Sequence, residues 1–177
     1  MTVKAYLSGN LVHDRVIRAF AEGCGAELRT FDQYEPSDVA VIFGVYKSRV
    51  PISWPRGHVF QSQRKNNLDV VVLETGYINR GDGETHHYAA GFNGLNGRAD
   101  FRNKGMPSDR AHKLRRDHGL RFLRWREKGN HIVLCAQVPW DASVENIDYM
   151  KWLADMANKL MMTDTKVIFR PHPKARL

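Results

Sequence analysis

The sequence predicts an α/β fold, with a Rossmann-like parallel sheet covered by helices and then the opening strand–helix–strand unit of a second Rossmann-like domain. Short and nearly continuous apolar runs alternate with segments of helical period over the first third of the chain, and the same alternation restarts after residue 130. The 177 residues are enough for one domain and part of another. A hydrophobic fraction of 42% supports a packed core and excludes a disordered, collagenous or coiled-coil chain.

The first part of the chain contains four apolar runs that we interpret as strands. Val3–Leu7 is the first, and Asn10 is placed to cap a helix over residues 11–22, with apolar side chains on one face. The runs at 38–44 and 69–73 are apolar throughout, which is typical of strands buried on both faces of a sheet. The other predicted elements of this part are a strand at 28–31 and a helix at 58–66.

The middle of the chain has a different character. Residues 79–107 are rich in glycine and predict a long loop region. Residues 108–128 predict one helix, with an apolar stripe at helical spacing. The stripe consists of Ala111, Leu114, His118, Phe122 and Trp125. Strands at 131–135 and 165–169 then flank a helix that we expect to begin at Ser143. The predicted organisation is therefore a domain at 1–107, a basic linker helix at 108–129, and an incomplete domain at 130–177.

The positive charge of the chain is concentrated in residues 98–128, which include most of the predicted linker helix. The formal net charge is +8, and residues 98–128 contain eleven basic and four acidic residues, which is nearly the whole excess. Such a field attracts partners that carry phosphate groups. The candidate nucleic-acid or acceptor contacts are Arg115, Arg116, Arg121 and Arg124. The alternative is a solvated helix face without a partner.

The remaining composition limits the class of protein. Cys24 and Cys135 lie far apart in apolar surroundings, so we interpret both as small core residues and expect a cytoplasmic protein without disulfides. No apolar run approaches the length of a membrane helix, and we expect no signal peptide and no transmembrane segment. The adjacent His86 and His87 lack well-spaced partner ligands, and we interpret His118 as a packed side chain, so we predict no metal site.

The sharpest local pattern is the run Arg-Pro-His-Pro at residues 170–173, directly after an apolar strand. Two prolines restrict the backbone, so the guanidinium of Arg170 and the imidazole of His172 are held in place. Fixed cationic donors of this kind suit a phosphate or diphosphate, and Lys174 adds a third positive group. The alternative is a basic surface tail.

Two further sets of polar residues follow predicted strands. Gln137, Asp141 and Ser143 lie between the strand ending at Cys135 and the next helix, where backbone N–H groups favour an anion. Ser143 is equally suited to a purely structural helix cap, and Asp141 is suited to a hydroxyl group. Glu74 follows the fourth strand, where a carboxylate serves either as a general base or merely as a charged residue leaving the sheet.

The segments 132–143, 152–153 and 167–173, together with Glu-Thr-Gly-Tyr at residues 74–77, resemble the capsule polysaccharide glycosyltransferase family, which includes the Kdo transferases. The glycine-rich stretch at 86–109 is similar to that of phage-encoded members. The resemblance spans roughly residues 40–177. It implies a GT-B architecture, in which two Rossmann-like domains face a cleft and a nucleotide-sugar donor is the co-substrate, with no other cofactor.

The resemblance also assigns roles to residues. It places Gln137, Asp141 and Ser143 in the donor loop, Arg170 and His172 near the donor phosphates, and Glu74 on the acceptor side. Because family members continue beyond the Arg-Pro-His-Pro run, we expect this chain to be a part of such an enzyme or one half of a split enzyme completed by a second chain. The expected acceptor is a glycan or modified DNA. The alternative function is a non-enzymatic nucleic-acid-binding protein that acts through residues 98–128.

Overall fold

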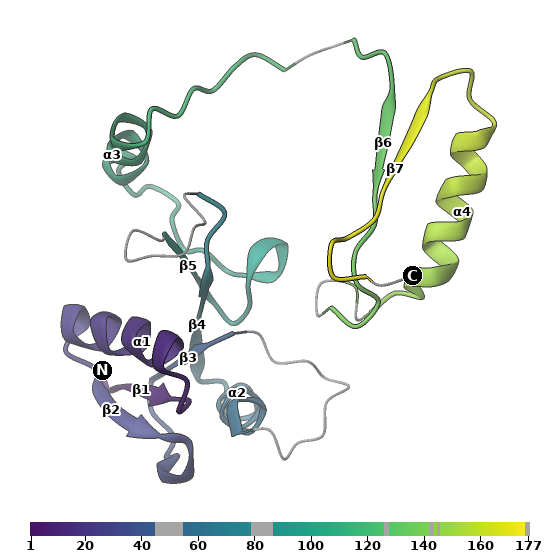
Figure 1. The fold of residues 1–177 in the computed structure, drawn as a ribbon. Helices are drawn as coiled ribbons and strands as arrows, with labels where there is room; N and C mark the ends of the chain where they lie inside the picture. Colours follow the sequence, from purple (N-terminus) through teal and green to yellow (C-terminus); the bar gives the residue numbers. More distant parts are fainter. Residues whose placement is uncertain (45–54, 79–86, 126–127, 142–143, 145, 176–177) are drawn as a thin grey trace. The chain divides into compact units, whose positions relative to one another are not determined.

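We describe the protein from a computed structural model, which covers residues 1–44, 55–78, 87–125, 128–141, 144 and 146–175 (Figure 1). The chain divides into two compact units, Met1–Leu120 and Arg121–Leu177. Each unit has its own sheet.

The first unit contains a five-stranded sheet in the order β2-β1-β3-β4-β5. The strands β1 to β4 are parallel to one another, and β5 is antiparallel to β4. The mixed α/β architecture, with its mostly parallel sheet, confirms the predicted Rossmann-like fold class. The elements are β1 (Val3–Leu7), α1 (Leu11–Cys24), β2 (Glu27–Thr30), η1 (Phe31–Gln33), β3 (Val39–Phe43), α2 (Pro55–Lys65), β4 (Asp69–Thr75), β5 (Tyr88–Phe92), η2 (Asn96–Arg98) and α3 (Asp109–Asp117).

Helices cover both faces of this sheet, as near-continuous apolar strands require. On β3, Val41 packs into a cluster with Ile17 of α1, whereas its neighbour Ile42 packs on the other face with Val59 of α2. Figure 1 shows α1 and α2 on opposite sides of the strands. Every residue of β3 is buried, which confirms the prediction made from its uninterrupted apolar run. The helix α1 begins where expected, because Asn10 Oδ1 accepts hydrogen bonds from the backbone N–H groups of Val12 and His13.

The prediction of an uninterrupted loop over residues 79–107 is wrong, because β5 lies within it and pairs with β4. The strand has little intrinsic β-propensity, so only pairing with the edge of β4 reveals it. The absence of a side chain at Gly91 allows close packing, since a Cβ there would overlap the Ala99 side chain. Phe92 then pairs with Asp100 in an isolated antiparallel bridge.

The predicted helix over residues 108–128 is also wrong in its second half, because α3 ends at Asp117. Gly119 has a φ of +59°, a left-handed conformation that glycine adopts without strain. The N–H of Leu120 donates to the carbonyl of Arg115, and that of Gly119 donates to Arg116, which is the Schellman pattern of a helix end. Phe122 and Trp125 therefore lie outside any helix and are 76% and 92% exposed.

The second unit is the predicted strand–helix–strand arrangement. It consists of β6 (Ile132–Cys135), α4 (Tyr149–Met161) and β7 (Val167–Arg170), and β6 and β7 are parallel. The expected start of its helix at Ser143 is wrong. The side chain of Asp148 caps α4 by accepting a hydrogen bond from the N–H of Lys151, so the helix begins at Tyr149.

Both cysteines differ from expectation. Cys24 is the last residue of α1 and Cys135 is the last residue of β6, and both side chains are exposed rather than packed in a core. Apolar sequence neighbours do not bury a side chain at the end of an element, because successive side chains point in different directions there.

Candidate functional site

The carboxyl edge of the β6–β7 sheet brings together two of the predicted motifs. Cys135 is in register with Arg170, and the N–H of Ala136 donates to the carbonyl of Arg170 over 2.9 Å. Gln137 and His172 therefore leave the sheet at the same edge, from adjacent parallel strands. This is the edge at which ligands bind in open parallel sheets.

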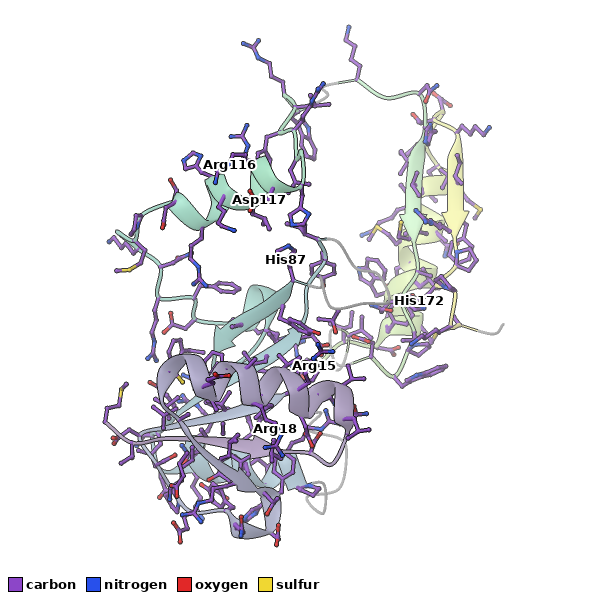
Figure 2. All side chains as sticks on the ribbon, turned by 60° about the vertical axis from the view of Figure 1, so that its left-hand side comes forward. Arg15, Arg18, His87, Arg116, Asp117 and His172 are labelled. Atoms are coloured by element: carbon purple, nitrogen blue, oxygen red, sulfur yellow. The ribbon has the colours of Figure 1, made fainter. Side chains whose placement is uncertain are left out.

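The imidazole of His172 is fixed by the backbone that follows it. Its Nδ1 accepts a hydrogen bond from the N–H of Lys174 over 3.1 Å, and the N–H of Ala175 donates to the carbonyl of His172. Because Nδ1 is the acceptor, a neutral ring carries its proton on Nε2, which is then a donor for an anionic oxygen. His172 is half-buried, whereas Arg170 and Lys174 are exposed. Figure 2 shows His172 at this edge.

The residues predicted to form a donor loop lie in a turn that is tied to α4. The N–H of Gln137 donates to the hydroxyl of the buried Tyr149 over 2.6 Å, and the Gln137 side chain accepts from the N–H of Val138. The N–H of Asp141 donates to the carbonyl of Val138, which makes Asp141 a half-buried turn residue. Ser143 lies outside the described residues. The amide oxygen of Gln137 therefore already accepts a hydrogen bond within its own turn.

Glu74 belongs to the first unit, at the carboxyl end of β4, where it pairs with Ala89 of β5. Its side chain is half-buried, and Oε1 accepts a hydrogen bond from the N–H of Thr75 over 2.9 Å. Glu74 lies two residues after Val72, so it faces the same side of the sheet as α2.

The cations of α3 form a second candidate surface. His112, Arg115, Arg116 and Leu120 line a shallow hollow of about 400 Å³ at the end of the helix. No described residue of α3 is buried, so the helix is exposed almost all round. Asp117 Oδ2 pairs with Lys113 over 2.9 Å, and its Oδ1 lies 3.6 Å from Arg116 Nε. These contacts, the hydrogen bond from Lys113 first, lower the pKa of Asp117. Figure 2 shows Arg116 and Asp117 on this helix.

The four predicted cationic contacts do not form one helical face. Arg115 and Arg116 lie on α3 in the first unit, whereas Arg121 and Arg124 lie in the non-helical segment that begins the second unit. Both of the latter side chains are exposed. The left-handed Gly119 separates the two pairs, so the helical spacing that united them in the sequence does not apply.

Sequence reasoning missed a crevice at the carboxyl edge of the five-stranded sheet. It has a volume of about 270 Å³ and lies over the ends of β2, β1 and β3. Its lining residues are Ser8, Asn10, His13, Phe31, Phe43, Pro55 and Arg56. The strand ends at Ser8 and Gly44 were a signal for this edge, but nothing in the local pattern singled out His13, Phe31 or Arg56.

His87 of the glycine-rich region meets His118, the residue that follows the end of α3. The Nε2 atoms of His87 and His118 lie 2.6 Å apart, and the two rings meet edge to face. His118 is thus a half-buried partner of His87, while His86 lies outside the described residues. Within the described ranges, no three His, Cys, Asp or Glu side chains are grouped so as to hold a metal ion.

Comparisons with protein-family models, with curated proteins and with solved structures gave no match to this chain. In the part of the chain that the structure describes, no helix combines the length and apolar character needed to cross a bilayer.

Proposed function

We propose that this chain is a nucleotide-sugar-dependent glycosyltransferase, or a part of one, that holds the donor phosphates at the carboxyl edge of β6 and β7. The observation that supports the proposal most directly is the register of Cys135 with Arg170. It brings the Gln137 loop and the Arg-Pro-His-Pro loop to one edge, although about 33 residues separate them along the chain.

The chemistry of this edge suits a leaving phosphate. In glycosyl transfer the nucleotide leaves the sugar as an anion, and positive groups near its phosphates stabilise the developing charge. Arg170 supplies a planar fork of N–H donors, and His172 supplies its Nε2, since Nδ1 already accepts from Lys174. Glu74 and Asp141 are the carboxylates proposed to orient or deprotonate the acceptor hydroxyl, which belongs to a glycan or to modified DNA.

The proposal predicts that nucleotide binding depends on this edge. Titration calorimetry with CMP and with nucleoside diphosphates should show binding that Arg170→Ala and His172→Ala each weaken about tenfold, which corresponds to roughly 1.4 kcal/mol. Lys166→Ala is the matched control, because Lys166 is an exposed cation just before the start of β7, at the opposite edge. Undiminished affinity in both Arg170→Ala and His172→Ala would exclude the donor site.

The cations around α3 favour a second candidate function, binding to nucleic acid. The hollow beside Arg115 and Arg116 presents positive charge on an exposed helix. Phosphate contacts of this kind release condensed counterions, so the affinity falls steeply with salt. The two functions are compatible if the acceptor is DNA.

Nucleic-acid binding should disappear when the four cations are neutralised. Replacing Arg115, Arg116, Arg121 and Arg124 by alanine should weaken duplex DNA or RNA binding and make the logarithmic salt dependence shallower by about one unit for each lost contact. The control carries the same change of charge elsewhere, at Arg18, Lys65, Lys159 and Lys166. Equal losses of affinity in the two variants, measured by fluorescence anisotropy across a salt series, would show that net charge alone is responsible.

A further inference from the structure

The crevice of the first unit lies at the topological switch point of its sheet. The order β2-β1-β3 places β1 between two strands, and the chain leaves β1 into α1 on one face but leaves β3 toward α2 on the other. The connections therefore diverge above the ends of β1 and β3. In open parallel sheets this divergence creates the ligand crevice.

Aromatic side chains line the crevice from both faces of the sheet. The ring of His13 stacks on Phe43 with centroids 4.2 Å apart and an angle of 13° between the planes. Phe31 lines the crevice from the opposite face of the sheet, where it stacks on the buried Tyr6, which holds it in position. Aromatic surfaces of this kind pack against the flat face of another ring, and a stacked base contributes roughly 1–3 kcal/mol.

The α2 side of the crevice carries a guanidinium in a defined position. Arg56, in the first turn of α2, is half-buried, and its Nη1 donates to the carbonyl of Phe43 over 3.3 Å. Gly44 makes this possible, because a Cβ at that position would overlap Arg56 Nη1. Its φ of +86° also disfavours any other residue. Arg56 is thus held over the end of β3, where a fork of N–H donors suits a phosphate.

At the α1 side of the crevice, side chains of the protein itself already accept hydrogen bonds from the backbone N–H groups of the loop that follows β1. The carboxylate of Asp14 accepts from the N–H groups of Ser8 and Gly9 and from the Ser8 hydroxyl, over 2.6 to 3.0 Å. Asn10 caps the first N–H groups of α1. An anion at this end would meet the charge of Asp14, so the phosphate of a ligand belongs on the Arg56 side.

We infer that this crevice binds a phosphorylated ring compound, with its phosphate on Arg56 and its ring against the aromatic side chains of His13 and Phe31. The volume of about 270 Å³ suits one small ring compound, such as a mononucleotide or a sugar phosphate. The site lies entirely within Met1–Leu120, whereas the proposed donor phosphates bind in Arg121–Leu177. The inference therefore does not depend on the proposed glycosyl transfer.

The test uses the full chain and four kinds of probe: 5′-mononucleotides, the matching nucleosides, ribose 5-phosphate with glucose 6-phosphate, and inorganic phosphate. Calorimetry should show binding of a mononucleotide or a sugar phosphate. Amide chemical shifts should change at residues 8–13, at Gly44 and at Arg56. Whichever of the two compound classes binds identifies the ligand. Nucleosides and inorganic phosphate should bind about tenfold or more weakly, because each lacks one half of the recognition.

Substitutions at Arg56 identify the site. Arg56→Ala should weaken binding about tenfold or more, and Arg56→Lys should restore part of the loss, since it keeps the charge but not the fork. Arg18→Ala is the control, because Arg18 is an exposed cation of α1 that does not line the crevice (Figure 2). An amide spectrum of each variant shows that the fold is retained.

Several results would overturn the inference. These are no binding at millimolar concentration, equal affinity for inorganic phosphate alone, or full affinity in Arg56→Ala. Binding that Arg170→Ala abolishes and Arg56→Ala leaves intact would support the donor site and exclude the crevice. The reverse pattern would support the crevice.

Discussion

Replacing Gln63 by leucine is expected to destabilise the first unit by about 3 kcal/mol, because the amide of Gln63 satisfies several polar groups in a fully buried position. Its Nε2 donates to the carbonyls of Ser37 and Asp69 over 2.8 and 3.1 Å. Its Oε1 accepts from the N–H of Ser37 and from the hydroxyl of Tyr34. Leucine fills the space but leaves these groups without that partner.

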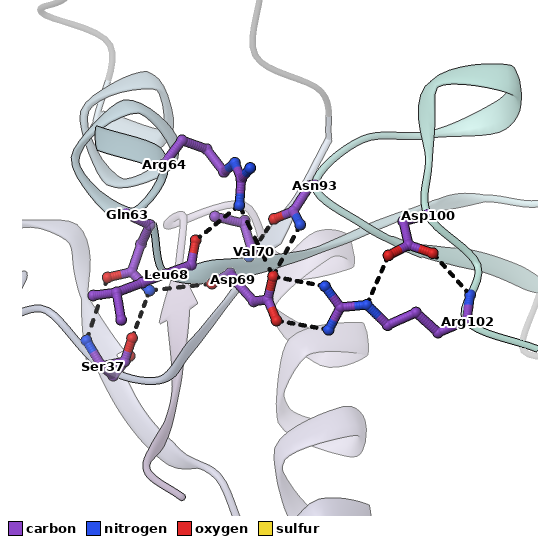
Figure 3. Close-up of polar contacts among 9 residues, drawn as sticks. All are labelled: Ser37, Gln63, Arg64, Leu68, Asp69, Val70, Asn93, Asp100 and Arg102. Carbon is purple, nitrogen blue, oxygen red and sulfur yellow. Dashed lines mark hydrogen bonds and ion pairs between the residues drawn. The ribbon is translucent and has the colours of Figure 1, made fainter. Parts of the chain in front are cut away.

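The position of Gln63 explains why the effect is large. The side chain joins α2 to the segment before β3 and to the start of β4, as Figure 3 shows. Lys65→Leu is the matched control on the same helix, since Lys65 is exposed and its replacement leaves no buried polar group. Urea denaturation followed by circular dichroism measures both changes. A loss in Gln63→Leu no larger than that of the control would show that the amide contributes nothing.

Asp69→Ala is expected to cost about 2 kcal/mol at neutral pH, because it removes the acceptor of three hydrogen bonds, two of them from a guanidinium. Arg102 Nη1 and Nη2 donate to Asp69 over 2.6 and 2.8 Å, and Asn93 Nδ2 donates over 2.9 Å. Asn93 in turn accepts from the N–H of Val70, and Arg102 also pairs with Asp100 (Figure 3). Asp69 therefore fastens the segment after β5 to the beginning of β4.

The same carboxylate predicts an acid-dependent loss of stability. The hydrogen bonds from Arg102 and Asn93 lower the pKa of Asp69 from its ordinary value of 3.8 to about 2. A carboxyl whose pKa is lower in the folded state stabilises the protein above its unfolded pKa and loses that contribution as the pH falls through the folded pKa. The difference in stability between the native chain and Asp69→Ala should therefore be constant above pH ~5 and shrink between pH ~4 and pH ~2.

The control for this prediction is Asp32→Ala, which removes a carboxylate of the same unit whose side chain is exposed. Urea titrations at several pH values give the free energy of unfolding of each variant. Asp32→Ala should change it by less than about 0.5 kcal/mol, as is usual for an exposed side chain. A difference for Asp69→Ala that grows on acidification would contradict the sign of the lowered pKa.

Much of the architecture followed from local pattern. The uninterrupted apolar runs of β3 and β4 predicted strands buried on both faces, and the structure places helices on both sides of them. Asn10 predicted the start of α1, because its side chain acts on N–H groups only two and three residues away. The parallel pairing of β6 and β7 followed from the strand–helix–strand order. This pairing brings the loop with Arg170 and His172 to the edge of the sheet at which the Gln137 loop also begins.

Local pattern was insufficient wherever a distant segment supplied the decisive contact. The strand β5 exists because β4 offers an edge, and residues 88–92 alone give little indication of a strand. The prediction of a helix through Phe122 and Trp125 is wrong because the left-handed Gly119 ends α3. The spacing of apolar residues does not reveal the conformation of a single residue.

The sequence by itself determined the class of fold, the parallel direction of the strands in each strand–helix–strand unit, and the strand ends at which polar residues gather. Only the tertiary structure decided that Arg56 lies over the end of β3 beside the His13–Phe43 stack, and that Gln63 and Asp69 join segments some 30 residues apart. The physical reason is that helix and strand periods depend on neighbouring residues, whereas a crevice or a buried hydrogen-bond network depends on long-range packing.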